Sequence, residues 1–125
     1  MFKIKVFTGI TIVVTFLVML VSCASPAEPL TTEPDFNGFI TEIHQIDRND
    51  VIGSIAVESH ADKLVEKYVV TVKDETSLFR QDGDDYLRVS FDELKAKQWV
   101  QIWFTGPVME SFPMQATALQ IVITP

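Results

Sequence analysis

Apolar and polar residues alternate along most of the chain after residue 36, with the period of two that is typical of strands buried on one face. The pattern predicts strands at 39–44, 51–57, 68–72, 99–104 and 116–123, with a short piece at 76–79 and an extended segment at 86–89, and so five or six short strands in all. In the strand at 99–104, one face carries Val100, Ile102 and Phe104, and the other carries Trp99, Gln101 and Trp103.

Clusters of turn-forming residues separate several of these strands. Residues 47–50 read Asp-Arg-Asn-Asp and residues 82–85 read Asp-Gly-Asp-Asp, so both predict tight turns. The first of them joins two strands into a hairpin. Gly53 predicts a bulge or a tight bend inside the second strand, and the polar run at 60–66 predicts a connection.

One short helix interrupts the strands. Ser90 and Glu93 have the spacing of a capping box, in which the glutamate carboxylate reaches back to the serine amide. Phe91 and Leu94 fall three residues apart and are expected to face the core, and the helix is expected to end near Lys97. Residues 36–125 are therefore predicted to form a mainly β domain, a small antiparallel OB-like β-barrel with one short helix before a late strand.

The first 22 residues have the pattern of an export signal. Lys3 and Lys5 precede an uncharged, mostly apolar run at 6–21. The run ends at Leu20-Val21-Ser22-Cys23, which resembles the lipobox of bacterial lipoproteins. In such proteins cleavage leaves the cysteine as the new N-terminus, and its sulfur carries a diacylglyceryl group. An uncleaved membrane anchor is the alternative, although the run is shorter than the usual 20 residues.

This reading predicts a protein that is lipid-anchored through Cys23 on the outer face of the cell membrane. Two acyl chains on one residue give firm anchoring. Residues 23–35 hold Pro26, Pro29 and Pro34 among polar residues, and they are expected to form a flexible tether. A dozen residues of this kind span roughly 20 Å.

Charge narrows the range of partners. The chain has 10 basic and 17 acidic residues, and residues 23–125 keep 8 and 17 of them, so their formal charge is 8 − 17 = −9. An acidic surface repels phosphate backbones, so nucleic acid is not an expected partner. The same surface favours a soluble monomer.

The C-terminal part carries a resemblance to a known family. Residues 105–115 read Thr-Gly-Pro-Val-Met-Glu-Ser-Phe-Pro-Met-Gln. They resemble the signature of the DUF3221 family, also called YobA-like, of small Gram-positive lipoproteins and secreted proteins. Residues 38–40 and 90–94 are also similar to it, whereas Lys97 stands where the family often has glycine. The resemblance implies an exported small β-domain with no established activity.

Residues 106–115 are expected to form a loop with two alternative roles. Glu110 and Gln115 could bind the donors of a ligand above an apolar floor of Phe112 and Met114. Alternatively, Glu110 accepts hydrogen bonds from backbone amides of its own loop, Gln115 holds the last strand, and Phe112 plugs an end of the barrel.

Trp99 and Trp103 form a second candidate site. On one strand face they could make an exposed aromatic platform for a glycan or a peptide, since OB barrels bind ligands on their strand faces. The alternative is that both rings pack under the helix or the tether, because large exposed aromatic patches are uncommon on monomers.

No catalytic constellation, metal site or cofactor motif is expected. His44 and His60 are the only histidines, and no metal-ligand spacing joins them. Residues 82–93 resemble a calcium loop at both ends but lack its central glycine.

The predicted function is a non-enzymatic binding or envelope-interaction module. Its expected partners are a glycan, a peptide or an envelope protein. The alternatives are a small cell-wall-directed hydrolase or inhibitor, and a structural accessory of a membrane complex.

Overall fold

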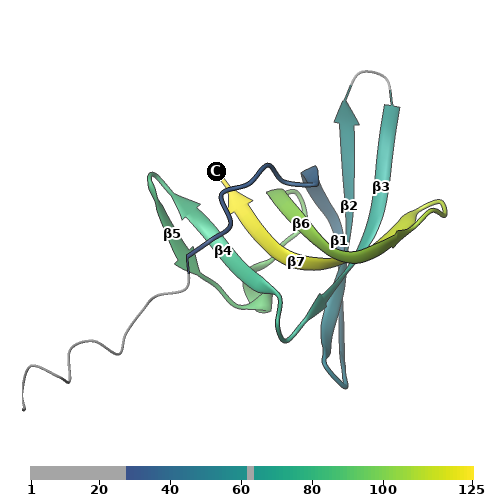
Figure 1. The fold of residues 1–125 in the computed structure, drawn as a ribbon, viewed down its shortest axis with the longest axis horizontal. Helices are drawn as coiled ribbons and strands as arrows, with labels where there is room; N and C mark the ends of the chain where they lie inside the picture. Colours follow the sequence, from purple (N-terminus) through teal and green to yellow (C-terminus); the bar gives the residue numbers. More distant parts are fainter. Residues whose placement is uncertain (1–27, 62–63) are drawn as a thin grey trace, which may run out of the picture.

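A computed structural model describes residues 28–61 and 64–125, so the predicted signal, Cys23 and the cleavage site lie outside the described residues. The described chain is built almost entirely of strands (Figure 1). They are β1 (Phe36–Arg48), β2 (Val51–Ala61), β3 (Leu64–Lys73), β4 (Ser77–Asp82), β5 (Asp85–Arg88), β6 (Trp99–Met109) and β7 (Met114–Thr124).

Five strands close into a barrel. The strand order is β3-β2-β1-β6-β7, and β3 pairs again with β7 to complete the ring. Neighbours in the ring are antiparallel except for β3 and β7, whose parallel pairing joins Tyr68–Thr71 to Met114–Thr117. The predicted OB-like barrel is confirmed, with the difference that the closing pair is parallel.

The alternation in the sequence determines the inside of the barrel. Branched apolar side chains project inward from all five strands and leave almost no surface exposed, because each inward position is covered by the opposite wall. The fully buried members are Ile40, Ile55, Val57, Val70, Val72, Val100, Ile102 and Ile121.

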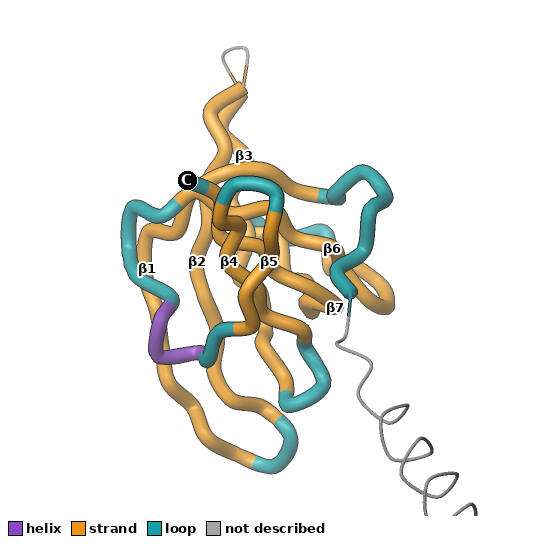
Figure 2. The backbone as a smooth tube through the Cα atoms, turned by 90° about the vertical axis from the view of Figure 1, so that its left-hand side faces the viewer, coloured by secondary structure: helices purple, strands orange, loops and turns teal. Residues whose placement is uncertain are grey.

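The connection from β3 to β6 contains the β4–β5 hairpin and one short helical turn, purple in Figure 2. β4 extends the sheet by pairing in parallel with β7. Gly83, at φ +62°, forms the tight turn predicted at 82–85.

The predicted helix is shorter than expected. Only Phe91–Glu93 (η2) is helical, and it is a 3₁₀ turn. The Ser90 amide donates to Glu93 Oε2 at 3.2 Å, as the capping pattern predicted. Leu94 then turns to extended backbone with ψ 130°, and its side chain is buried. Packing of Phe91 and Leu94 in the core therefore stops the helix before a second turn forms.

The predicted loop at 106–115 is a hairpin instead. β6 continues to Met109 and β7 begins at Met114, so only residues 110–113 form the turn. Gly106, at φ +72°, lies in an irregularity of the β6–β7 register between Thr105 and Met109. The connection predicted at 60–66 is likewise mostly strand, because β2 runs to Ala61 and β3 starts at Leu64.

Gly53 has the role that the sequence predicted for it. The register shifts beside it in the β2–β3 ladder. A Cβ atom at this position would lie 2.5 Å from both the His44 carbonyl oxygen and the Phe91 ring. Glycine is needed here because the helical turn packs directly on the strand backbone.

Residues 28–35, called the strap below, lie on the outside of the barrel. We predicted residues 23–35 as a flexible tether, but the strap is hydrogen-bonded to β6 and β7 at several points. It covers a second small core of Phe79, Trp103 and Val122 on the outer face of β4, β6 and β7. The folded unit therefore begins before Phe36.

Candidate functional site

Four outward-facing side chains form one row across four strands. Trp99 of β6 lies opposite Phe39 of β1, Phe39 lies opposite Glu58 of β2, and Glu58 lies opposite Lys67 of β3. Strands in a sheet are about 4.8 Å apart, so the row spans roughly 14 Å. We call these four residues and His60 the outer row.

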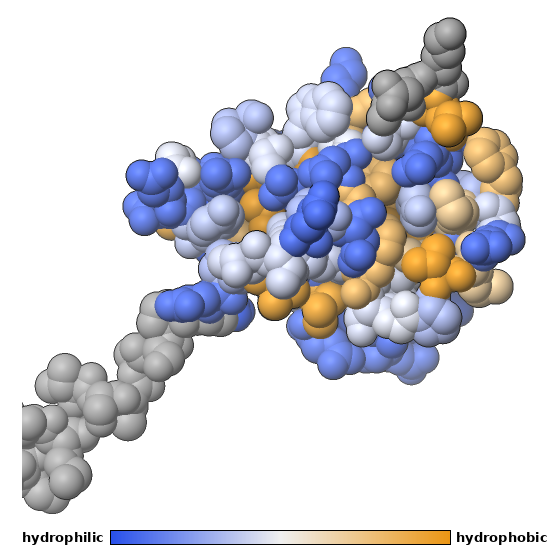
Figure 3. Space-filling model, turned by 45° about the horizontal axis from the view of Figure 1, so that its top comes forward, coloured by the Kyte–Doolittle hydropathy of each residue, from blue (hydrophilic) through white to orange (hydrophobic). Residues whose placement is uncertain are grey.

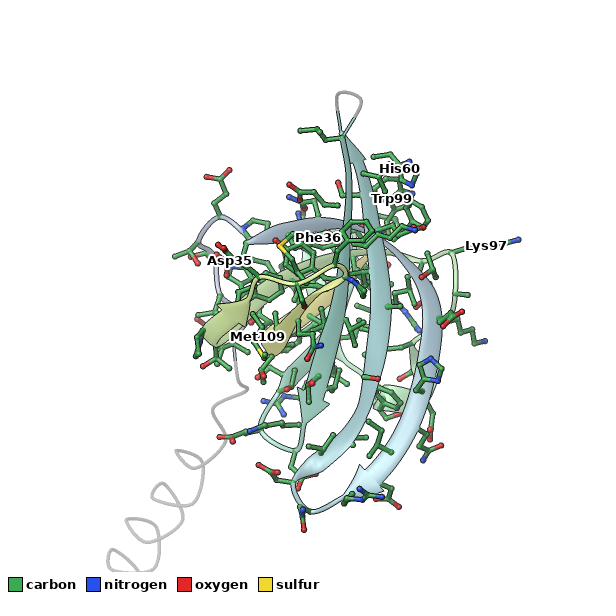
Figure 4. All side chains as sticks on the ribbon, turned by 90° about the vertical axis from the view of Figure 1, so that its right-hand side faces the viewer. Asp35, Phe36, His60, Lys97, Trp99 and Met109 are labelled. Atoms are coloured by element: carbon green, nitrogen blue, oxygen red, sulfur yellow. The ribbon has the colours of Figure 1, made fainter. Side chains whose placement is uncertain are left out.

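The first half of the outer row is aromatic. The Phe39 ring lies 5.7 Å from the Trp99 ring at an interplanar angle of 66°, and 5.5 Å from the His60 ring at 19°. Figure 4 shows Trp99 and His60 next to each other, close to the β2–β3 hairpin. Trp99 is 54% exposed. The contacts between the rings hold them as a single surface that a ligand can reach.

The second half of the outer row is ionic. Lys67 Nζ lies 3.3 Å from a carboxylate oxygen of Glu58, and His60 Nε2 lies 4.0 Å from the other. The Glu58 side chain is only 22% exposed, and the Lys67 ammonium group is its ion-pair partner. A ligand on the rings would therefore meet a carboxylate and an ammonium group next to them.

An open groove of about 310 Å³ continues from the ionic half of the outer row. Pro113, in the turn of the β6–β7 hairpin, also contributes to its lining. The groove is lined by Thr41, Glu42, Ala56, Val57, Glu58, Lys67, Tyr68, Val69 and Pro113.

The predicted loop residues lie near this groove or at the hairpin tip. Gln115 is paired with Val69, a groove residue. Phe112, beside Pro113, is 77% exposed, so the alternative that it plugs a barrel end is wrong. Glu110 is exposed in the turn. Within the turn, the Ser111 hydroxyl donates a hydrogen bond to the Pro113 carbonyl at 2.7 Å. No side-chain hydrogen bond among the described residues involves the side chain of Glu110 or Gln115.

The two tryptophans have different surroundings. Trp99 belongs to the outer row, but Trp103 is only 7% exposed. The Trp103 indole N–H donates to the carbonyl and hydroxyl oxygens of Thr32, at 3.1 Å each. Of the two alternatives, packing under the tether is therefore correct for Trp103, which the strap covers, and exposure is correct for Trp99.

Sequence reasoning missed Phe39, Glu58, His60 and Lys67 as site residues. Each faces outward on a strand that the alternation predicts or extends. The signal available was an aromatic residue on the face opposite the buried Ile40. What made a site of them is the register between strands, which alternation does not report.

The pKa of the Tyr68 hydroxyl on β3 is raised above its ordinary value. Its ring packs against Phe36 at 5.1 Å and Phe104 at 5.3 Å between ring centres. Burial raises the pKa of the Tyr68 hydroxyl, and the negative charges of Glu66 and Asp35 raise it further. Tyr68 is therefore a neutral hydrogen-bonding group at physiological pH.

A larger open cleft, of about 460 Å³, lies where β7 leaves β3. Gly106 and Pro107 form one side of it, and Lys73 and Glu75 form another. No aromatic side chain lines this cleft. The outer row is therefore the stronger candidate for ligand contact.

The described residues contain neither a candidate metal cluster nor a candidate membrane-spanning helix. Residues 28–61 and 64–125 contain no group of three or more His, Cys, Asp or Glu side chains placed to hold a metal ion. Within the same ranges no helix is long and apolar enough to cross a membrane.

The fold and its outer surface define a small closed β-barrel domain of OB-like connectivity. The chain belongs to the DUF3221 family, whose sequence model, described as "Protein of unknown function (DUF3221)", matches residues 51–124. No curated protein and no solved structure matches the chain.

Proposed function

We propose that this protein is a lipid-anchored, non-enzymatic binding module on the outer face of the cell membrane, and that its outer row binds a glycan of the cell envelope. The observation that carries the proposal is the row itself. It places the exposed Trp99 ring and the partly buried Phe39 ring on one strand face with the Glu58 carboxylate and the Lys67 ammonium group.

The chemistry of the row suits a sugar. Aromatic rings offer flat apolar surface to the ring face of a pyranose, while Glu58 accepts hydrogen bonds from hydroxyl groups and Lys67 donates to sugar oxygens. In OB barrels the face of the second and third strands and the loop between the last two bind oligosaccharides or oligonucleotides. Here those are β2, β3 and the turn that contains Pro113. The acidic surface disfavours the oligonucleotide.

A sedimentation assay with insoluble cell-wall glycan tests the binding. The lipidated protein in detergent is mixed with the glycan, and the bound fraction is measured for the native chain, Trp99→Ala and Tyr86→Ala. Tyr86 is a matched control, since it is 44% exposed but lies on β5. We expect Trp99→Ala to bind at least about tenfold more weakly, a loss of about 1.4 kcal/mol, and Tyr86→Ala to bind as the native chain does.

Equal binding by Trp99→Ala and the native chain would overturn the glycan site. Digesting the wall with a glycosidase should abolish binding, and digesting it with a protease should not. If the protease abolishes binding and the glycosidase does not, the partner is a protein and not a glycan.

The anchor is tested separately. The chain is made in a Gram-positive host beside Cys23→Ala, and intact mass and membrane fractionation are measured. We expect a mature chain that starts at Cys23, carries the added diacylglyceryl mass and leaves the membrane fraction when Cys23 is replaced. A chain without lipid, or one cut elsewhere, contradicts the anchor and leaves the glycan assay unaffected.

A further inference from the structure

The strap is fixed to the barrel at three points along its length. The Leu30 amide donates to Gln120 Oε1 at 2.8 Å, and the Trp103 indole donates to Thr32. At the end of the strap, the Asp35 amide donates to the Ile102 carbonyl at 2.9 Å, and Asp35 Oδ2 accepts from the Phe104 amide at 2.8 Å. The strap therefore follows one course across β7 and β6.

The residues under the strap are buried, although they face outward. Gln120 is 2% exposed and Trp103 is 7% exposed. An outward amide and indole become this inaccessible only when a further layer covers them, and here the strap is that layer. The Gln120 side-chain oxygen accepts from the strap and the Trp103 indole N–H donates to it, which makes the docked course specific. The Gln120 side-chain nitrogen is buried without a hydrogen-bond partner among the described residues.

The beginning of the strap has a defined place. Glu28 and Leu30 line a small pocket together with Ser77 of β4 and with Leu119 and Gln120 of β7. Figure 1 shows the strap, in dark blue, running from the side of β4 and β5 to the start of β1. The point where the described chain begins is therefore on the β4–β7 side of the barrel.

The length of chain before the strap limits how far this side can be from Cys23. Five residue steps separate Cys23 from Glu28, and at about 3.6 Å each they span at most about 18 Å whatever their conformation. Without the strap, thirteen steps to Phe36 would reach about 47 Å. Docking of the strap thus shortens the maximum distance between Cys23 and the barrel by more than half. It also fixes the side of the barrel from which the chain leads to Cys23.

We infer that the side bearing Leu30 and Leu119 is the surface that the anchored protein turns toward the lipid headgroups. The inference rests on the proposed function, since it needs a lipid on Cys23. Leu30 is 42% exposed and Leu119 is 44% exposed, so each presents apolar surface next to the point where the anchor chain arrives.

The outer row then points away from the membrane. Figure 1 shows the tip of the β2–β3 hairpin at the upper right and the beginning of the described chain on the left, beside β5. Trp99 and His60 lie close to that hairpin (Figure 4). Figure 3 shows hydrophobic residues along the lower edge, next to the point where the described chain begins, as well as toward the right. The strap therefore presents the binding surface to the cell wall.

Site-specific quenching tests this orientation. The lipidated chain is reconstituted into vesicles of phosphatidylcholine and phosphatidylglycerol that contain a lipid with a spin-labelled headgroup. A fluorophore is attached to Leu119→Cys or to Val65→Cys, which is matched at 43% exposure and lies in β3 opposite His60. The Cys23 sulfur is a thioether in the lipidated protein, so only the new thiol reacts.

We expect the label at position 119 to lose fluorescence to the spin-labelled lipid and the label at position 65 to keep it. Inserting twelve Gly and Ser residues between Ala27 and Glu28 should remove the difference, because it restores the reach and leaves the strap docked. Equal loss at both positions in a chain whose mass shows the lipid overturns the inference alone. A mass without lipid overturns the anchor and this orientation together.

Discussion

The indole N–H of Trp103 is hydrogen-bonded to Thr32, a residue 71 positions earlier in the chain. This contact makes Trp103 a reporter of the strap. The chain has two tryptophans, so Trp99→Phe leaves Trp103 as the only one. We expect its fluorescence to be weakly quenched by acrylamide, and strongly quenched after residues 28–34 are replaced by Gly and Ser.

Trp103→Phe provides the control for this experiment. It leaves Trp99, which is 54% exposed, and that ring should be quenched equally with and without the strap. If the accessibility of Trp103 does not change when the strap is replaced, the strap does not cover it in solution.

Lys97 is predicted to destabilise the native state. Its φ is +75°, in the left-handed region where a Cβ costs about 1–2 kcal/mol. Its amide donates to the Ile40 carbonyl at 2.7 Å, so the backbone cannot relax without losing that bond. We expect Lys97→Gly to raise the free energy of unfolding by about 0.5–1 kcal/mol, after the greater chain entropy of glycine is subtracted.

The matched variant is Lys97→Ala, which removes the charge but keeps the Cβ. Urea denaturation of the two variants decides the question. If both variants unfold with a higher free energy than the native chain, the effect comes from the charge of Lys97. If neither does, the backbone of Lys97 is not strained.

Thr76 is hydrogen-bonded to β7 between the part of that strand that pairs with β3 and the part that pairs with β4. Its hydroxyl accepts from the Lys73 amide at 2.9 Å and donates to the Ala118 carbonyl at 2.8 Å. We expect Thr76→Val, which keeps the shape and removes both bonds, to cost about 1–3 kcal/mol in urea denaturation. Thr76→Ser should retain most of the stability, and an equal loss in both variants would indicate packing rather than hydrogen bonding.

Tyr68 makes stability depend on pH in the alkaline range. Its pKa in the folded state is raised above the ordinary value of 10.0 by burial and by two carboxylates. Above pH 10 the unfolded chain releases the proton while the folded chain still binds it, so stability falls as pH rises from 10 through the folded pKa. Below pH 10 this contribution is constant.

Absorbance titration of Tyr86→Phe checks this prediction, because Tyr68 is then the only tyrosine. We expect it to ionise at higher pH in the folded protein than in urea, and Glu66→Gln to bring the two curves closer. Coincident folded and unfolded curves would contradict the raised pKa.

Local sequence determined the strands and several turns. Side-chain alternation requires only that one face be buried, so it identified the five barrel strands although not their ends, and it indicated β4 and β5 only as a short piece and an extended segment. The turn at Gly83 and the bond between the Ser90 amide and Glu93 depend on neighbours within a few residues.

The length of the β6–β7 hairpin was not determined locally. Gly106 and Pro107 favour a turn by themselves, yet both lie within β6. Pairing of Met109 with Gln115 and of Met114 with Tyr68 extends the strands past them. Ladder bonds with neighbouring strands outweighed the local preference.

The sequence by itself determined which residues face inward and that the domain is a small barrel. Only the tertiary structure decided that Phe39 lies between Trp99 and His60, and that the strap covers Trp103 while Trp99 stays exposed. The physical reason is that periodicity records which face of a strand is apolar. Which strand lies beside it, and what covers its outer face, depend on contacts between residues far apart in the chain.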